Sequence, residues 1–287
     1  MKQIKYIFAA ILVLLTSGCF RNDTMEDITI YTTAYPIEYV VTRLYGEHST
    51  IKSIFPNGSI QGEVVSDKLL QDYSSTDLFI FNGLGVNEQD YVYKMLEYNK
   101  KLKIIDVTSS IVYHNKVEEL WLDPMNLLTI SNNIQKGFNE YIDSTYLTND
   151  IAEEYATLKQ DLIKLDADYR EMAGRANRST LVVSNDMFLY LEKYNITVIS
   201  LEENDNLTQK NIHTVIEMVK NGDIKYIYTV KGSEVNNTIK NIQKQTNIEL
   251  IELHDLYKLT EEEFNKEENY FTLMRNNLEL LKNQLYD

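Results

Sequence analysis

The chain has 287 residues, of which 44% are hydrophobic and 25% are charged. These fractions are typical of a globular protein and exclude collagen-like and disordered chains. The formal net charge of −15 excludes a surface that binds nucleic-acid phosphates, so no nucleic-acid partner is expected. Three prolines and ten glycines are too few for an all-β protein with many tight turns.

The N-terminus has the pattern of a secretory signal peptide over residues 1–18. Two lysines precede an apolar run, Ile7 to Leu15, that is too short to cross a bilayer. Cys19 follows directly and is the only cysteine of the chain, so no intrachain disulfide can form. Cys19 is either a stray thiol near the cleavage point or a lipid attachment site. The segment Leu15–Cys19, LTSGC, resembles a bacterial lipobox, except that Thr16 stands where an aliphatic residue is more usual.

Acylation of Cys19 anchors a protein to the cell membrane without a spanning helix. The expected location is therefore extracytoplasmic, with the membrane contacted through the N-terminal lipid. Residues 19–27 are polar and lack periodicity, which predicts a lipid-anchored tether. The folded body is expected to begin at Ile28.

Residues 28–147 predict an N-terminal α/β lobe. Short apolar runs without polar alternation are separated by helical stretches, which is the pattern of a parallel sheet buried on both faces. The expected strands are 27–32, 51–55, 78–81 and 102–107, and the expected helices are 37–44, 67–73 and 89–99.

A long helix is predicted within residues 148–177, which we interpret as a connector. Seven apolar residues there are spaced alternately four and three apart, the period of one helical face. They are Ile151, Tyr155, Leu158, Leu162, Leu165, Tyr169 and Met172. The alternative is the arm of a coiled-coil dimer, but no heptads extend the stripe. We therefore expect a monomer in which this helix packs across two lobes.

Residues 178–287 repeat the α/β pattern and predict a second lobe. Its expected strands are 180–184, 197–200, 224–229 and 249–253, and its expected helices are 187–194, 209–221 and 235–246. The predicted fold class is α/β, with two similar lobes that each hold a mainly parallel four-stranded sheet, joined by one long helix. The cleft between two such lobes is the expected binding site.

Four segments together resemble a family of bacterial metal-binding proteins. They are Ser75–Gly83 (STDLFIFNG), Trp121–Asn126 (WLDPMN), Val182–Phe188 (VVSNDMF) and the tail 259–278 with LTEEE and YFTLMRNNL. The family comprises the zinc- and manganese-binding substrate-binding lipoproteins of ABC importers. The resemblance implies two α/β lobes joined by a backbone helix, an ABC permease and its ATPase as partners, and a transported divalent ion.

The ligand positions that this resemblance implies are substituted. Members of the family hold the ion mainly with histidines, whereas here the four positions correspond to Gln61, Glu119, Asn185 and Asp255. A different count places the first ligand at Gly62, which has no side chain to donate, so Gln61 is preferred. None of the four histidines of the chain occupies a ligand position.

All four implied ligands offer oxygen. Oxygen donors suit manganese, magnesium or calcium, whereas zinc prefers imidazole and thiolate. One hypothesis is a site altered for a harder ion, with Asp123 and Asp186 as nearby substitutes for an amide. The other is a decayed site that binds something else or nothing. The identity of the ion, manganese, zinc or another, stays open at this point.

No enzyme is expected, because the chain has no G-x-S-x-G elbow, Walker A motif or complete dinucleotide fingerprint. The predicted function is an extracytoplasmic solute-binding lipoprotein that captures a divalent cation between its lobes and delivers it to a permease. The alternative is a surface-displayed, adhesin-like interaction protein that keeps the fold and has lost the ion.

Overall fold

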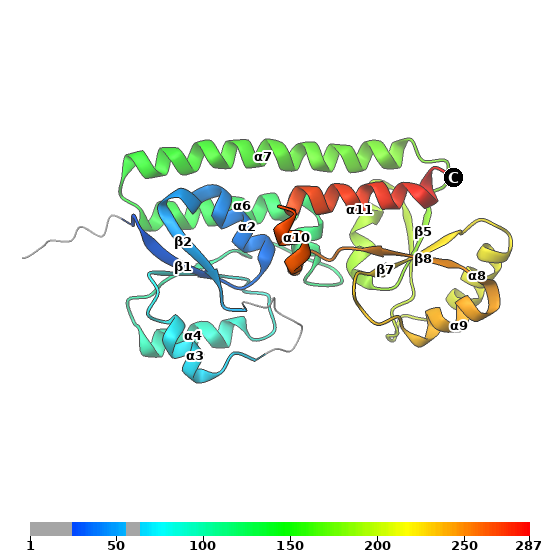
Figure 1. Ribbon diagram of the computed structural model, residues 1–287, viewed down its shortest axis with the longest axis horizontal. Coiled ribbons are helices and arrows are strands. Elements are labelled where there is room, and N and C mark those ends of the chain that lie inside the picture. Colours follow the sequence, from blue (N-terminus) through cyan, green and yellow to red (C-terminus); the bar gives the residue numbers. More distant parts are fainter. Residues whose placement is uncertain (1–24, 56–63) are drawn as a thin grey trace, which may run out of the picture.

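Two lobes lie side by side beneath one long helix in the computed structural model, which describes residues 25–55 and 64–287 (Figure 1). The N-terminal lobe contains β1 (Ile28–Thr32), α2 (Tyr35–Tyr45), η1 (Gly46–His48), β2 (Ser49–Ser53), α3 (Asp67–Tyr73), β3 (Leu78–Phe81), α4 (Glu88–Tyr98) and β4 (Lys103–Asp106). Its sheet has the order β2-β1-β3-β4, and all pairs are parallel. The predicted strand 51–55 lies two residues earlier, because Ser49 pairs with Ile28 at the start of β1.

The C-terminal lobe has the same topology. It contains β5 (Thr180–Val183), η2 (Asp186–Tyr194), β6 (Thr197–Ser200), α8 (Gln209–Lys220), β7 (Tyr226–Val230), α9 (Asn237–Thr246) and β8 (Glu249–Leu253). The order is β6-β5-β7-β8, again fully parallel. The expectation of two similar parallel lobes is therefore confirmed. The helix predicted over residues 187–194 is present as η2, a 3-10 helix that begins one residue earlier, at Asp186.

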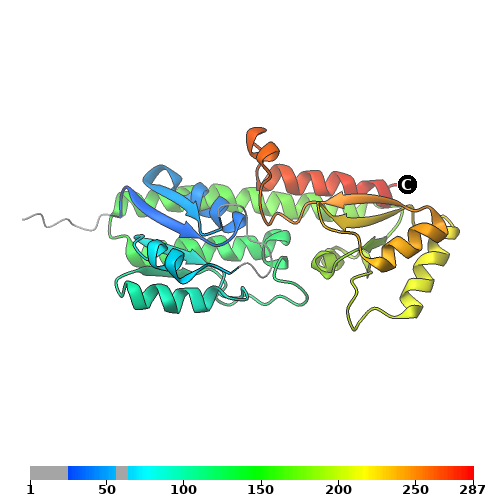
Figure 2. The ribbon, with the colours of Figure 1, turned by 60° about the horizontal axis from the view of Figure 1, so that its bottom comes forward.

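The long helix α7 (Thr145–Gly174) has 30 residues, so it begins three residues before the predicted start and also ends earlier. It begins where Ser144 accepts a hydrogen bond from the backbone N–H of Leu147. Six of the seven predicted stripe residues are buried, and Tyr155 is half-buried. Helices α2 and α6 (Pro124–Tyr141) from the first lobe and α11 (Tyr270–Leu285) from the second lobe pack against α7 (Figures 1 and 2). The predicted connector across both lobes is confirmed.

Four α-helices of the described chain were not predicted: α5 (Glu119–Leu122), α6, α10 (Glu261–Asn265) and α11. Helix α6 carries clear start signals, because Asp123 caps it and Pro124 occupies its first position. Its buried face, however, includes Ser131 and Gly137, which weakens the apolar pattern. Gly137 is required there, because a Cβ atom would come within 2.6 Å of the Ile105 side chain on β4.

The folded body begins before Ile28, where the sequence predicts its start. Met25 is buried at 1% exposure, and its carbonyl accepts a hydrogen bond from the Tyr45 hydroxyl. The backbone N–H of Asp27 donates to the carbonyl of His48. Residues 25–27 therefore belong to the folded body and not to the expected tether. The predicted signal peptide and Cys19 lie outside the described residues, and among the described helices none is long and apolar enough to cross a membrane.

A cluster of charges joins the two lobes to α7. Lys193 on η2 forms ion pairs with Asp123 at the start of α6 and with Asp166 on α7. Asp166 also accepts hydrogen bonds from the Tyr194 hydroxyl at 2.9 Å and from Arg170 at 2.8 Å. Asp166 is 6% exposed, so these contacts compensate for the hydration that its carboxylate loses on burial.

Replacing Asp166 with Asn is expected to remove a pH-dependent part of the free energy of unfolding. Burial raises the pKa of Asp166, but hydrogen bonds from Lys193, Arg170 and Tyr194 outweigh burial and hold the pKa below its usual range. Such a carboxylate stabilises the fold above its unfolded-state pKa, and this contribution is lost as the pH falls through the lower folded-state pKa.

Asp166→Asn should therefore cost about 2 kcal/mol at pH 7 and progressively less below about pH 4. Urea unfolding of both proteins across this range measures the difference. A difference in the free energy of unfolding that does not change with pH would contradict the assignment.

Candidate metal site at the lobe junction

The candidate ligands of the described chain lie on three segments that meet between the lobes. Glu119 begins α5, Asn185 precedes η2, and Asp255 follows β8. Helix α5 packs against η2, and the indole Nε1 of Trp121 donates to the carbonyl of Asp255 at 2.8 Å. The segments of Asn185 and Asp255 leave the carboxyl ends of their strands, where open parallel sheets usually bind ligands. Gln61 and Gly62 lie outside the described residues.

Glu119 holds a loop in place. Its side chain is almost fully buried, at 4% exposure. One carboxylate oxygen accepts the backbone N–H of His114 at 3.1 Å, and the other accepts those of Asn115 at 3.0 Å and Lys116 at 3.4 Å. Ionised carboxylates accept such bonds strongly and have about four lone-pair sites in all. The structure thus gives Glu119 a loop-holding role that the sequence did not suggest.

Asn185 has a local partner as well. Its side-chain oxygen accepts the backbone N–H of Met187 at 2.9 Å and so caps η2. The neighbouring Asp186 accepts a hydrogen bond from the Asn204 amide at 2.9 Å, and its backbone N–H donates to Glu202. Asp123, the other suggested substitute, is engaged with Lys193 and with the backbone N–H of Met125. Both suggested acids therefore have partners of their own.

Asp255 lies in a strained turn. Its Oδ1 accepts the backbone N–H of Tyr257 at 3.1 Å, whereas Oδ2 has no hydrogen bond to any described residue. Leu256, between Asp255 and Tyr257, has a φ of 58°. This left-handed conformation costs roughly 1–2 kcal/mol for residues other than glycine. The side chain of Asp255 is 29% exposed, so one carboxylate oxygen is available to a ligand.

A buried ionic cluster lies beside this turn. His254 is 5% exposed; its Nδ1 accepts the backbone N–H of Leu256, and its Nε2 lies 3.2 Å from the carboxylate of Glu263. Burial raises the pKa of Glu263, but hydrogen bonds from Lys231 and Thr260 lower it to about 2. Glu263 is therefore ionised near neutral pH, and His254 is occupied on both ring nitrogens.

The loop that Glu119 holds also reaches the second lobe. The ammonium group of Lys116 lies 2.6 Å from a carboxylate oxygen of Glu202, just after β6. Beside this ion pair is a hollow of about 200 Å³, which is lined by Asn115 of the first lobe and by residues of the second lobe that include Asp186 and Asn204. Polar groups from both lobes thus surround a small space at the junction.

The described donors differ from a histidine-rich metal centre. Within residues 25–55 and 64–287, no group of three or more His, Cys, Asp or Glu side chains is placed to hold one ion. Any site at the junction must therefore draw on amide oxygens, backbone, water or residues outside the described part. Such a donor set fits an oxygen-preferring cation better than one that requires imidazole.

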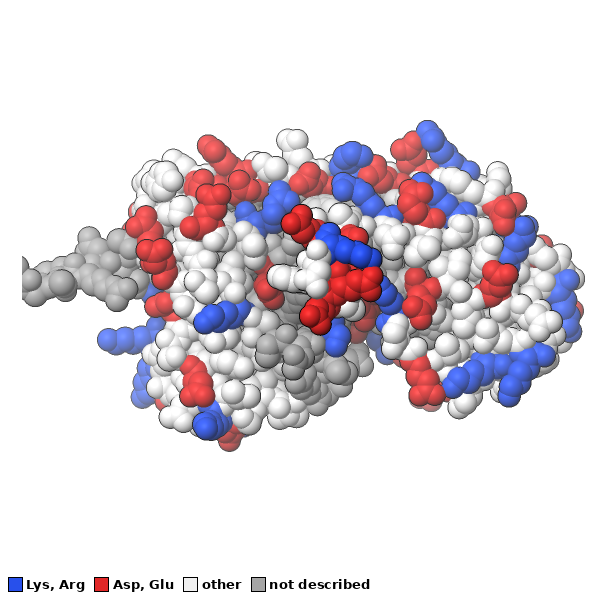
Figure 3. Space-filling model, viewed as in Figure 1, with Lys and Arg blue, Asp and Glu red and all other residues white. Residues whose placement is uncertain are grey.

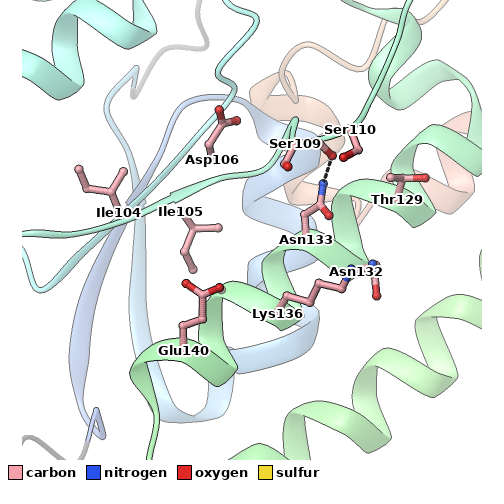
Figure 4. A pocket seen from close by; sticks show the side chains of 11 residues that line it. Ile104, Ile105, Asp106, Ser109, Ser110, Thr129, Asn132, Asn133, Lys136 and Glu140 are labelled. Carbon is pink, nitrogen blue, oxygen red and sulfur yellow. Dashed lines mark hydrogen bonds between the residues drawn. The ribbon is translucent and has the colours of Figure 1, made fainter.

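A separate pocket lies in the first lobe, between β4 and α6 (Figure 4). Its volume is about 340 Å³. Asp106, Lys136 and Glu140 line it, with Lys136 extending toward Asn132 and Glu140 pointing toward Ile105. Of the described candidate ligands, Glu119, Asn185 and Asp255, none lines this pocket, so it is distinct from the site that they would form.

The surface is mixed in charge despite the net charge of −15. Acidic and basic side chains alternate over both lobes, and acidic groups gather at the centre, over α10 (Figure 3). The exposed members there include Glu261, Glu262 and Glu267, beside Phe264, which is 72% exposed. This protruding helix lies in front of the lobe junction without contributing a candidate ligand.

Two residues at the junction have roles that the sequence did not predict. The sequence places Trp121 in the WLDPMN motif and Asn277 in the C-terminal tail. Asn277 is 3% exposed; it accepts the backbone N–H of His254 and donates to the His254 carbonyl, both at 2.8 Å. Their roles depend on contacts between distant segments, which no local pattern reveals.

Comparison with known proteins places these features in a wider group. The family model described as zinc-uptake complex component A, periplasmic, matches residues 30–284. Zinc-binding lipoprotein AdcA of Streptococcus pneumoniae is 23% identical over an alignment covering 98% of this chain and 61% of its own length. Zinc-binding protein AdcA of Streptococcus pyogenes is also 23% identical, over 89% of this chain and 55% of its own length. The chain thus spans between half and two thirds of the curated relatives it matches.

Solved structures show the same fold. The Zn(II)-bound ZnuA-like domain of Streptococcus pneumoniae AdcA superposes with a TM-score of 0.73 and 22% identity, covering 91% of this chain and 100% of that chain. The metal-dependent lipoprotein YcdH from Bacillus subtilis gives a TM-score of 0.73 with 18% identity and the same coverage.

Proposed function

Because the chain belongs to the family of periplasmic zinc-uptake complex component A proteins, we propose that it captures a divalent cation between its lobes for import. One observation carries this proposal: the segments that hold Glu119, Asn185 and Asp255 come from both lobes and contact one another. One carboxylate oxygen of Asp255 is open to a ligand. Gln61, outside the described residues, is the proposed fourth donor.

The donor chemistry favours a hard ion. Glu119 and Asp255 supply two negative charges, which nearly neutralise a divalent cation, and amide oxygens with water complete an oxygen shell. Most sites bind zinc more tightly than manganese, so selectivity arises from donor type. Without imidazole or thiolate, the zinc preference should be small. We propose manganese or a similar oxygen-preferring ion as the cargo, with zinc as a weaker competitor than in a histidine site.

We also propose the family's transport partners for this chain. An ABC permease and its ATPase receive the ion after the loaded protein docks on the membrane. Cys19, through its lipid, keeps the protein on the extracytoplasmic face of that membrane. The chain acts as a binding protein, and no catalytic step is proposed.

Calorimetric titration of the metal-stripped protein with manganese, zinc, magnesium and calcium tests this function. We expect saturable binding of one ion per chain for at least one of them, accompanied by thermal stabilisation. An ion present at 100 times its dissociation constant stabilises the folded state by about 2.7 kcal/mol. Asp255→Ala should abolish both signals, because Asp255 is the carboxylate among the described candidate ligands that keeps an oxygen without a hydrogen bond.

Glu252→Ala is the matched control. Glu252 is an exposed acid three residues before Asp255, on β8, so its loss changes the net charge equally without touching the candidate site. The Glu252→Ala variant should bind the ion with the same affinity as the unaltered protein. Absence of binding for all four ions would overturn the proposed function, as would equal binding by Asp255→Ala.

A further inference from the structure

We infer that Trp121 and Asn277 are positioning residues that fix the Asp255 carboxylate before any ion binds; this inference rests on the proposed function. The two residues bind the turn 254–257 from two different elements. Trp121 lies on α5 of the first lobe and Asn277 on α11 of the second. Both are buried, at 1% and 3% exposure.

Trp121 contacts the turn at two points. Its indole N–H donates to the carbonyl of Asp255 at 2.8 Å, and its ring meets the ring of Tyr257 edge to face, with centroids 5.4 Å apart. Its own carbonyl accepts the hydroxyl of Tyr270 at 2.7 Å. Trp121 is therefore held by the second lobe on both its backbone and its side chain, only two residues from Glu119.

Asn277 holds the residue before Asp255. Its amide oxygen accepts the backbone N–H of His254, and its amide nitrogen donates to the His254 carbonyl. This pair of bonds replaces the partners that a neighbouring strand would supply beyond the end of β8. Asn277 thereby holds the backbone of His254, which directly follows β8 and precedes the candidate ligand Asp255.

The left-handed conformation of Leu256 indicates why the turn needs this support. Strained backbone persists where the surroundings over-determine it, and such places gather at binding sites. Here the support comes from Trp121, from Asn277 and from the His254 ring, which accepts the Leu256 N–H. These contacts fix the backbone on which the Asp255 side chain sits. The backbone N–H of Tyr257 donates to Oδ1 of that side chain, which leaves Oδ2 for a ligand.

One interaction therefore links the candidate ligands of the two lobes. Glu119 and Trp121 belong to the same short helix, and Trp121 bonds the backbone of Asp255 directly. Loss of the indole donor removes this bond, so the Asp255 segment should be held less tightly to the segment of Glu119. Outer partners of this kind typically change metal affinity by about 10–100-fold when they are removed.

The decisive variant is Trp121→Phe, which keeps an aromatic edge toward Tyr257 and removes the N–H donor. By calorimetry, its affinity for the ion bound by the unaltered protein should fall about 10–100-fold. Phe138→Leu is the control for lost packing volume, because Phe138 is fully buried in the first lobe beside Tyr45. Its affinity should stay within about twofold of the unaltered protein.

Hydrogen exchange of the ion-free protein gives a readout that needs no metal. The N–H groups of Leu256 and Tyr257 should exchange about tenfold faster in Trp121→Phe, the factor expected for one lost hydrogen bond. Asn277→Ala should have the same effect and replaces the first variant if that one does not fold. Unchanged exchange in these amides would overturn the positioning role.

The two proposals can fail separately. If the unaltered protein binds an ion through Asp255 and Trp121→Phe binds it equally well, the positioning inference is wrong and the proposed function stands. If the unaltered protein binds no ion, the proposed function is wrong, and the exchange of the turn amides alone decides whether Trp121 fixes the turn.

Discussion

Glu119→Ala is expected to destabilise the protein by about 3 kcal/mol, independently of any ion. The substitution leaves the backbone N–H groups of His114, Asn115 and Lys116 without their buried acceptor. Each unsatisfied donor costs about 1–3 kcal/mol, reduced where water reaches it. The loop also carries the Lys116–Glu202 ion pair, so the contact between the lobes should loosen.

Glu119→Gln separates charge from geometry in this test. Glutamine keeps one acceptor oxygen and replaces the other with an amide group, so roughly half of the destabilisation is expected. The free energies of unfolding are measured by urea denaturation in the absence of metal. If Glu119→Ala unfolds like the unaltered protein to within about 0.5 kcal/mol, the loop-holding role is wrong.

Leu162→Ala is expected to cost about 2–5 kcal/mol of folding free energy. Leu162 is 0% exposed near the middle of α7, where the helix packs on elements of both lobes. Removal of its side chain leaves a cavity that the rigid surroundings cannot fill. Thermal or urea unfolding measures the loss.

Its neighbour Ile163 supplies the matched control. Ile163 is 46% exposed on the same helix, so Ile163→Ala should change the free energy of unfolding by no more than about 0.5 kcal/mol. Equal losses from both substitutions would show that α7 is not packed as described. A loss restricted to Leu162 supports its place in the core.

The fold was largely predictable because its main elements have strong local patterns. Buried parallel strands such as Leu78–Phe81 are continuous apolar runs, and the α7 stripe follows one helical face over many turns. Helix α6 escaped prediction because Ser131 and Gly137 occupy part of its buried face. The packing of Met25 against Tyr45 depends on a distant hydroxyl and has no signature in the N-terminal sequence.

The candidate site was predictable only in outline. The order of motifs indicated which segments to examine, and the structure brings α5, η2 and the turn after β8 together. The sequence could not reveal that Glu119 accepts three backbone N–H groups or that the backbone of Leu256 is left-handed. Both features arise from loop conformation, which depends on contacts across the lobe junction rather than on residue spacing.

Anomalous diffraction from crystals of the protein saturated with manganese tests the central claim most directly. The account predicts one anomalous peak at the lobe junction, within about 2.0–2.6 Å of the Asp255 Oδ2 atom and of an oxygen contributed by the first lobe. A crystal with no peak there at saturating ion, or with its only peak elsewhere, would contradict an ion site built by the two lobes together.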